Sequence, residues 1–476
     1  MPTQDFFNLR DREIGGRRRQ PTQPRSVPSP YKFSRTLRGN EGLVRRLGME
    51  AKHQWHDGCV NTVHFTPSGR WLITGSDDQM VVIGDWQTGA VRLAYNSGHR
   101  NNVFQAKTLP FSNEQTIVTC AADGEVRVGV LQDDSEVATR RLANHRGRAH
   151  KLAVDPASAH VFLSTGEDGV VNQVDTRQEE AIPLVTVRAA PPGRQRKIGL
   201  NAISLNPMNS HLFATGGSDV FCRIFDRRRL PMTEALLAAG EEPCVEKLVP
   251  DHLQHQPHLT ITCTAYSHSG EELVASYNDE SIYLFDARNS SAGPGLFLQK
   301  YEGHRNERTV KGVNFFGQRS EYVVSGSDCG NFFIWDKETA EILSMQKADE
   351  EVVNCLEPHP HLTLLATSGI DDDVKIWAPI RDAPPSLAPA KRQAARNNKA
   401  RERNAAVCGS DSRVRPEVLF RAVLNNFDGF DFRSATTGEA DAPTYELAGS
   451  SDEDDDDDEE DDDDDDDDDD DVEEDE

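Results

Sequence analysis

Short runs of alternating apolar and polar residues recur along most of this chain, and each run ends in a turn signal. Residues 71–78 and 322–328 show the pattern clearly, because β-branched and apolar residues lead into Gly-Ser-Asp in both. Alternation with a period of two is typical of β-strands, and Gly, Ser and Asp favour tight turns. The pattern predicts an all-β protein built from many short strands.

The runs form a repeat whose strand ends can be counted. Counting one strand-end position in each unit gives spacings of 45, 45, 51, 60, 50 and 42 residues between Gly84, Gly129, Val174, Phe225, Phe285, Trp335 and Trp377. A blade of a WD40 propeller takes about 40 to 45 residues, and its third strand commonly ends in Trp-Asp. Seven such units predict a closed seven-bladed WD40 β-propeller over 51-380. Some units depart from the pattern, since Gly84 and Gly129 replace Trp and Cys329 replaces a turn aspartate.

The chain outside 51-380 has a different composition. The net charge is −28, but the stretch 451-476 contributes 24 of the 80 acidic residues, which leaves 56 acids against 52 bases elsewhere. Such a run of like charges repels itself and buries no core, so we expect a disordered polyacidic tail. This tail is either a solubilising segment, a lure for basic partners such as histones, or a contact for the chain's own basic stretch. The segment 1-50 is basic, and we expect it to be partly disordered.

Two terminal segments carry apolar residues at helical spacing. In 1-50, residues 5–14 predict a short helix with Phe6, Phe7 and Leu9 as anchors, although a helix this short needs a partner to be stable. In 381-450, six bases lie between Lys391 and Arg403, and residues 416–427 form a short amphipathic segment that could pack on the propeller. We therefore describe 381-450 as a basic linker.

The sequence offers little support for catalysis or metal binding. It lacks a phosphate-binding Gly-rich loop, a nucleophile elbow and a carboxylate pair in a catalytic context. His252, His255 and His258 lie between Cys244 and Cys263, but these intervals match no standard zinc site. We expect no enzyme activity, no cofactor and no metal.

Composition also limits where the chain works. The eight cysteines show no paired spacing, which indicates reduced thiols and a location in nucleus and cytoplasm. No apolar run approaches the 18 residues of a membrane span, and the basic amino terminus has no hydrophobic export signal. We expect no membrane partner and no direct contact with nucleic acid.

Three consecutive units end in an apolar residue followed by Asp, any residue and Arg. These Asp-x-Arg boxes pair Asp175 with Arg177, Asp226 with Arg228, and Asp286 with Arg288. The Asp belongs to the blade pattern, whereas closing a blade does not need the Arg. The three arginines therefore predict a surface for a docking partner.

Several runs resemble the WD-repeat substrate receptors of cullin-4 RING ubiquitin ligases, the DCAF family. These runs include residues 98–107, 275–280, 309–315, 324–330 and 353–362, within a similarity that covers about residues 33–379. The resemblance implies a non-catalytic receptor that presents protein substrates for ubiquitination. It also implies that the six box residues dock on the triple-propeller adaptor of the ligase, with Phe6, Phe7 and Leu9 inserting in its cleft. The alternative is a nuclear scaffold or histone-binding chaperone that works through its acidic tail.

A second set of arginines follows the histidines that open three units. Arg100, Arg146 and Arg305 come directly after His99, His145 and His304, which places them at the blade ends opposite the boxes. We expect these arginines either to capture an acidic or phosphorylated substrate segment or to pair with turn aspartates such as Asp77 or Asp328.

Overall fold

The computed structural model describes residues 39–132, 136–189, 196–230, 243–256, 258–288 and 295–408, with side chains up to 403. The chain divides into two units, Met1–Phe427 and Asp428–Glu476. Phe6, Phe7 and Leu9, the segment 416–427 and the polyacidic segment 451-476 lie outside the described residues. Predictions about those segments stay predictions.

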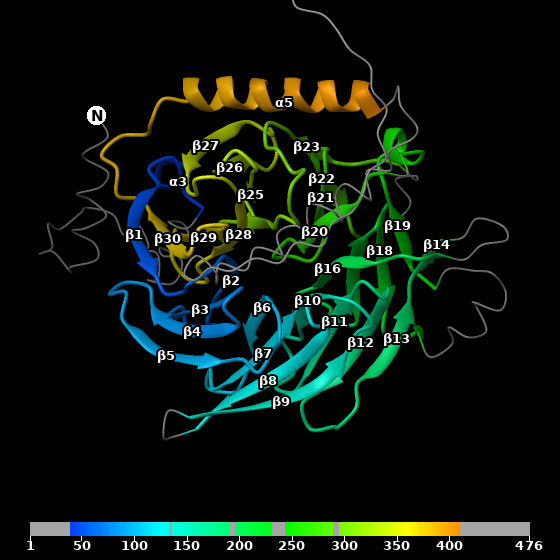
Figure 1. Cartoon of the computed structure of the whole chain (residues 1–476). Helices are drawn as coiled ribbons and strands as arrows, with labels where there is room; N and C mark the ends of the chain where they lie inside the picture. Colours follow the sequence, from blue (N-terminus) through cyan, green and yellow to red (C-terminus); the bar gives the residue numbers. More distant parts are fainter. Residues whose placement is uncertain are drawn as a thin grey trace, which may run out of the picture. The chain divides into compact units, whose positions relative to one another are not determined.

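Seven antiparallel sheets of four strands each follow one another around a common axis (Figure 1). Blade 1 holds β2 (Val60–Phe65), β3 (Trp71–Ser76), β4 (Met80–Asp85) and β5 (Val91–Asn96). Blade 2 holds β6 (Val103–Thr108), β7 (Thr116–Ala121), β8 (Glu125–Leu131) and β9 (Val137–Asn144). Blade 3 holds β10 (Ala149–Val154), β11 (Val161–Gly166), β12 (Val170–Asp175) and β13 (Ile182–Thr186). Blade 4 holds β16 (Leu200–Leu205), β17 (Leu212–Gly217), β18 (Asp219–Asp226) and β19 (Glu246–Leu248).

The remaining blades complete the ring. Blade 5 holds β20 (Ile261–Tyr266), β21 (Glu272–Tyr277), β22 (Ile282–Asp286) and β23 (Gln299–Tyr301). Blade 6 holds β24 (Val313–Phe316), β25 (Tyr322–Gly326), β26 (Asn331–Asp336) and β27 (Ile342–Lys347). Blade 7 holds β28 (Val353–Pro358), β29 (Leu365–Gly369), β30 (Asp373–Ala378) and, as its outermost strand, β1 (Gly48–Gln54). The prediction of an all-β, seven-bladed propeller is confirmed, and each predicted strand-end position lies within two residues of the end of a third strand.

Strand β1 closes the ring by pairing with the last strand of the propeller. Its residues run antiparallel to β30, from Gly48 opposite Ala378 to Gln54 opposite Asp373. An ion pair of 2.6 Å between Lys52 and Asp373 adds to this pairing. Blade 7 therefore combines chain segments from both ends of the propeller, and this pairing closes the ring.

The chain also forms smaller elements outside the seven blades. Helix α3 (Glu41–Val44) precedes β1, a 3-10 turn η2 (Asp251–Leu253) follows blade 4, and strands β14 (Arg188–Ala189) and β15 (Arg196–Lys197) form a hairpin after blade 3. Helix α5 (Ala388–Cys408) follows blade 7. No helix in the described part of the chain is long and apolar enough to cross a membrane.

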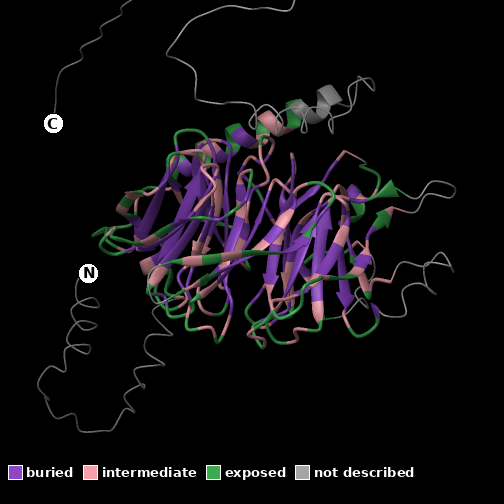
Figure 2. Ribbon diagram, turned by 60° about the horizontal axis from the view of Figure 1, so that its bottom comes forward, coloured by how far each residue is buried: buried purple, intermediate pink, exposed green. Residues whose placement is uncertain are grey.

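The core consists of apolar layers between neighbouring blades rather than one central cluster. Buried residues gather in seven clusters, and each cluster combines side chains of two adjacent blades. Figure 2 shows the buried residues concentrated in the strands and the exposed residues at the turns. Burial on both sides explains why the strands carry so many β-branched and aromatic residues. Each blade is thus stabilised by its neighbours on both sides.

Two blades without the expected Trp fill its place from elsewhere. A Cβ atom on Gly84 would lie 2.4 Å from the ring of Trp55, so this ring occupies the space beside the strand end. The indole N–H of Trp55 donates to the carbonyl oxygen of Gly89 over 3.1 Å. In blade 2, the corresponding Cβ atom on Gly129 would lie 2.9 Å from the hydroxyl of Tyr95. Both glycines are therefore required by a large neighbouring ring.

Helix α5 packs on blades 5 and 6, in the segment that we described as a basic linker. The buried side chain of Asn397 donates to the carbonyl oxygen of Gly303 over 2.7 Å. Arg401 donates to the hydroxyl of Ser281 over 2.9 Å and pairs with Glu302 over 3.4 Å. Five of the six bases predicted in this stretch are exposed, and Arg401 is the one that contacts the propeller. The basic run is therefore the outer face of a docked helix.

Candidate protein-interaction site

The three Asp-x-Arg boxes adopt one geometry in blades 3, 4 and 5. In each box, the Asp accepts hydrogen bonds from the backbone N–H and the Nε of the Arg two residues later. The two distances are 3.0 and 3.0 Å for Asp175, 3.0 and 3.0 Å for Asp226, and 2.9 and 3.0 Å for Asp286. Nη2 of each Arg donates to the second carboxylate oxygen over 2.7 to 2.9 Å. Each guanidinium therefore lies against the turn that carries it.

The Asp alone forms the turn, because two other blades make it without an Arg. Asp85 in blade 1 accepts from the backbone N–H of Gln87 over 2.9 Å, and Asp336 in blade 6 accepts from that of Glu338 over 3.0 Å. An Asp that bonds to the backbone two residues later is a common turn former. The arginines of blades 3 to 5 are thus additions to a turn that closes without them, as the sequence indicated.

The box arginines are exposed although their carboxylate partners are not. Their side chains are 65%, 60% and 58% exposed in Arg177, Arg228 and Arg288. The hydrogen bonds from these arginines lower the pKa of Asp175, Asp226 and Asp286 below the usual value. Each box therefore presents an ordered guanidinium on the surface, and in the third box Nη1 of Arg288 also lies 3.5 Å from the carboxylate of Glu271.

Neighbouring blades hold the box turns in place. Arg140 of blade 2 donates to the carbonyl oxygen of Thr176, inside the first box, over 2.5 Å. Arg227, inside the second box, pairs with Asp155 of blade 3 over 2.7 Å, and both side chains are largely buried. The latter contact also shows that the turn between the first two strands of a blade lies on the same face as the boxes. We call this face, defined by the three box pairs, the DxR face.

Exposed apolar side chains gather at the same ends of the blades. Phe111 and Met208, in turns between first and second strands, are 76% and 74% exposed. Other exposed apolar residues lie in or beside the turns between third and fourth strands, namely Val91, Val130, Ile182, Val245, Leu296, Phe297 and Leu298. Within the described residues, no large apolar side chain is exposed in the turns at the opposite blade ends. Exposed apolar groups beside ordered arginines are typical of protein-binding surfaces.

The opposite face, which we call the histidine face, carries His99, His145 and His304. Two of them hold the blade ends together through buried hydrogen bonds. His99 bonds to Asp123 over 3.2 Å and to Thr119 over 2.9 Å. His145 bonds to Asp168 over 3.0 Å and to Ser164 over 2.9 Å. These histidines are structural.

The arginines that follow these two histidines form hydrogen bonds through their backbone N–H groups. The N–H groups of Arg100 and Arg146 donate to Asp123 and Asp168 over 2.9 and 3.0 Å. Both side chains are exposed, and neither makes an ion pair with a described residue. Arg100 and Arg146 therefore stay candidates for contact with an acidic segment.

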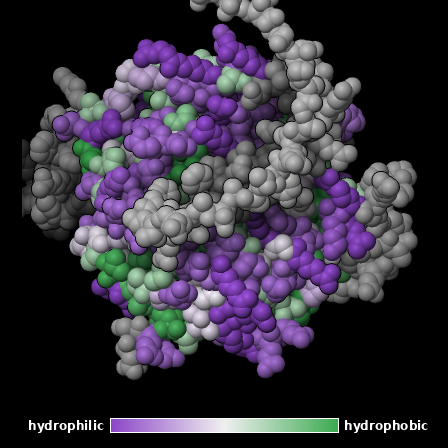
Figure 3. Space-filling model, viewed as in Figure 1, coloured by the Kyte–Doolittle hydropathy of each residue, from purple (hydrophilic) through white to green (hydrophobic). Residues whose placement is uncertain are grey.

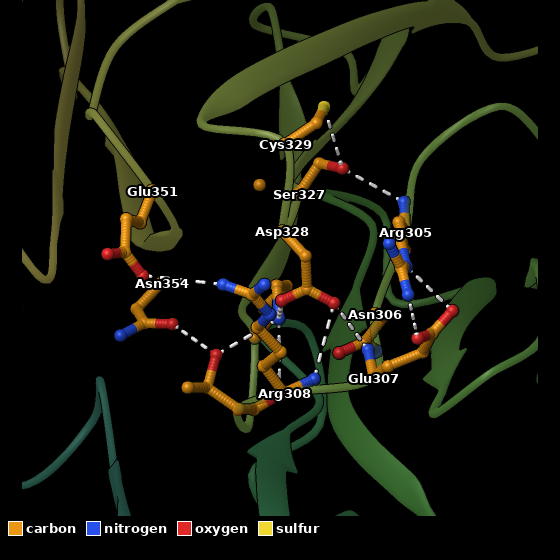
Figure 4. Close-up of polar contacts among 12 residues, drawn as sticks. Arg305, Asn306, Glu307, Arg308, Ser327, Asp328, Cys329, Glu351 and Asn354 are labelled. Atoms are coloured by element: carbon orange, nitrogen blue, oxygen red, sulfur yellow. Dashed lines mark hydrogen bonds and ion pairs between the residues drawn. The ribbon is translucent and has the colours of Figure 1, made fainter. Parts of the chain in front are cut away.

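His304 and Arg305 differ from the other two pairs. Both ring nitrogens of His304 are buried and have no hydrogen-bond partner among the described residues, and burial lowers its pKa to about 3. Arg305 is half-buried and binds Glu307, with 2.7 Å between Nε and Oε1 (Figure 4). Asp328 instead accepts from the backbone N–H groups of Glu307 and Arg308 and pairs with Lys311. The repeat position thus predicts the place of Arg305 but not its partner.

Asp279, in the turn between β21 and β22, interacts electrostatically with Glu307 and with Arg401 of α5. Burial and the nearby carboxylate of Glu307 raise the pKa of Asp279 to about 7. Arg401 of α5 and Arg305 act in the opposite direction. The seam between blades 5 and 6 therefore contains a carboxyl group that titrates near neutral pH.

Several candidate metal ligands in the described residues make contacts with other side chains. His99, Asp123 and Glu125 lie close together, but His99 bonds to Asp123 and Glu125 pairs with Arg127 over 2.7 Å. His252, from the histidine-rich loop, bonds to the hydroxyl of Tyr283 over 2.9 Å.

Two features of the structure were not predicted from the sequence. The exposed apolar turns of the DxR face were missed, because residues 97 positions apart, such as Phe111 and Met208, meet on one face only in the closed ring. Helix α5 was missed although residues 388–401 are rich in Ala, Arg, Lys and Gln, which favour helices.

Figure 3 shows the side seen in Figure 1, where hydrophilic residues predominate and hydrophobic ones form small patches.

Comparison with known families identifies the repeat. The family described as WD domain, G-beta repeat, matches residues 49–85, 295–336 and 341–378. The matches cover β1 to β4, β23 to β26, and β27 to β30. Strands β5 to β22 lie outside these matches, whereas Gly84, which stands in place of Trp, lies inside the first one.

Two curated relatives share about 30% of their residues with the chain. The protein ALTERED SEED GERMINATION 2 of Arabidopsis thaliana is 30% identical over 301 residues, 57% of this chain and 40% of the relative. Human DDB1- and CUL4-associated factor 6 is 31% identical over 277 residues, 56% of this chain and 31% of the relative. The aligned region thus spans less than half of either relative.

A third relative is more distant but aligns over most of its length. Human WD and tetratricopeptide repeats protein 1 is 22% identical over 590 aligned positions, covering 73% of this chain and 87% of the relative. A narrower resemblance of the sequence runs, to the eighth member of the DCAF family, stays a prediction.

Proposed function

Because this chain is a WD-repeat protein homologous to DDB1- and CUL4-associated factor 6, we propose that it is a substrate receptor of a cullin-4 ubiquitin ligase. In this proposal its DxR face docks on the DDB1 adaptor and its histidine face receives the protein substrate. The chain itself performs no bond chemistry. It raises the effective concentration of the substrate beside the ubiquitin-charged enzyme.

One observation carries the docking part of the proposal. Three successive blades present an arginine in the same geometry, with the guanidinium ordered by its own Asp and more than half exposed. Ordering before binding lowers the entropy lost on association, and arginine is enriched among residues that dominate interface energies. The exposed side chains of Phe111 and Met208 supply apolar area on the same face.

The amino-terminal segment enters the proposal as a second contact. Phe6, Phe7 and Leu9 would form the apolar side of a short helix that folds on the adaptor. We also propose that the protein acts in both the nucleus and the cytoplasm, where thiols stay reduced.

The docking test combines Arg228→Ala with Arg288→Ala and measures affinity for purified DDB1. We expect the affinity to fall by a factor of about 30 or more, which corresponds to about 2 kcal/mol. The melting temperature should change little, because the Asp residues still form both turns. The matched control is Arg100→Ala with Arg146→Ala, which removes two exposed arginines from the other face.

Two results would count against this assignment. Unchanged affinity of the Arg228/Arg288 variant at an unchanged melting temperature would exclude the boxes as the docking site. Recovery of core histones without DDB1 from cells would instead support the scaffold or histone-chaperone alternative.

A further inference from the structure

The innermost strands of the seven blades bring a set of side chains to the propeller axis. Strands β2, β6, β10, β16, β20, β24 and β28 contact one another in turn, and β28 returns to β2 (Figure 1). Side chains alternate along a strand, so equivalent positions in the seven strands face the axis together. The register of each strand with its neighbour fixes which positions these are.

Hydrogen bonds between the innermost strands of different blades connect side chains at these axial positions. His64 of β2 bonds to Glu357 of β28 over 3.2 Å and to Thr108 of β6 over 3.3 Å. Asn314 of β24 donates to the other oxygen of Glu357 over 3.4 Å. Glu357 is therefore already engaged from two sides.

Lys107 occupies the position of β6 that matches His64 in β2 and Glu357 in β28. Lys151 of β10 lies two register positions before the equivalent place in blade 3, and so faces the same way. Both side chains are half-buried. Burial lowers the pKa of Lys107. The charge of Glu357 on blade 7 opposes this lowering, and the charge of Lys151 on blade 3 adds to it.

The two lysines have no partner among the described residues. Neither ammonium makes a hydrogen bond or ion pair with a described residue. Matching axial positions in blades 3 to 5 hold small residues, namely Ala153, Ala202, Ser204, Cys263 and Ala265, and the one in blade 6 holds Asn314, which donates to Glu357. Two unpaired cations in a partly desolvated place repel each other, and a shared anion relieves this cost.

We propose that Lys107 and Lys151 form a binding site for a small polyvalent oxyanion of the phosphate class on the propeller axis. Two ammonium groups from adjacent blades donate to separate oxygens of one anion, which is how lysines bind phosphate. The ligand crosses the seam between blades 2 and 3 and so ties them together. This site is independent of docking on the DxR face, and either proposal can fail alone.

The experiment measures binding of inorganic phosphate to the full chain by calorimetry, at constant ionic strength set with chloride. We expect saturable binding to the native protein, and a loss of at least about tenfold in affinity in the variant Lys107→Gln with Lys151→Gln. Lys197→Gln, which removes an exposed lysine of β15 away from the axis, should bind phosphate like the native protein. Lys107→Arg keeps the charge and should retain binding.

Phosphate should also raise the melting temperature of the native protein more than that of the double variant, because a ligand stabilises only the state that binds it. Equal phosphate binding by the native protein and the double variant would overturn the proposal. So would the absence of saturable binding to the native protein. If the double variant does not fold, Lys107→Met alone provides the same comparison.

Discussion

At the scale of single residues, the molecule uses side chains that share one sequence pattern in different ways. His99 and His145 form hydrogen bonds through both ring nitrogens, whereas His304 has the same place in the repeat and forms none with a described residue. The reason is local, because Cys329 stands where an aspartate would accept from His304. A repeat therefore predicts where a residue lies better than it predicts which bonds the residue makes.

Asp279 gives a prediction for pH dependence. Its pKa is raised to about 7 in the folded state, above the usual 3.8 of an aspartate. The stability due to the neutral acid is present below the unfolded pKa and is lost as pH rises through about 7. We expect Asp279→Asn to gain stability relative to the native protein at about pH 8 and to gain less at about pH 5. Asparagine also tolerates the positive φ of 53° at this position.

Urea unfolding at the two pH values measures this difference. Asp382→Asn is the control, since Asp382 is exposed on the segment after blade 7. An equal effect of Asp279→Asn at both pH values would contradict the prediction.

At the scale of elements, strand ends were predictable and their surroundings were not. The seven strand-end positions follow from spacing, because each is set by residues close in sequence. The rings of Trp55 and Tyr95 that replace the missing Trp come from other strands or loops, so only the closed blade reveals them. The exposure of Arg177, Arg228 and Arg288 was predictable, because these residues lie outside the blade pattern. The bonds from each arginine to its own Asp needed the structure.

Helix α5 gives a prediction about attachment. Asn397→Ala removes the hydrogen bond to Gly303 and leaves a buried carbonyl group without a partner, which costs about 1 to 3 kcal/mol. We expect faster amide hydrogen exchange in α5, with little change in the blades. Lys399→Ala, on the exposed side of the same helix, should leave exchange unchanged. If both variants exchange alike, the contact with Gly303 does not hold the helix.

At the scale of the whole molecule, ring closure couples the two ends of the propeller. Removing residues 1–54 deletes β1 and α3, including Val44 and Leu47, which pack against blades 6 and 7. We expect the melting temperature to fall by about 10 °C or more, since β30 loses its partner strand and blade 7 part of its core. Removal of 451-476 is the comparison, and it should change neither the melting temperature nor DDB1 binding. A similar fall in both truncations would argue against a special role for β1.

The separation of the two faces gives a prediction at the same scale. Reversing charge with Arg100→Glu and Arg146→Glu changes the potential on the histidine face by several kT. We expect an acidic substrate to become longer-lived in cells while DDB1 is retained. Adding Arg305→Glu should have a smaller further effect, because Glu307 already neutralises Arg305. Loss of DDB1 from the Arg100/Arg146 variant would show that the faces do not divide the work in this way.

The pairing of β1 with β30 also has a consequence for synthesis on the ribosome. Residue 48 emerges early, but its partner strand ends at Ala378, so about 330 residues must be translated before the ring can close. Until then, β1 and the growing end of the propeller each present an unpaired strand edge, the kind of edge that promotes aggregation. We therefore expect nascent chains of this protein to depend on chaperones until translation has passed blade 7.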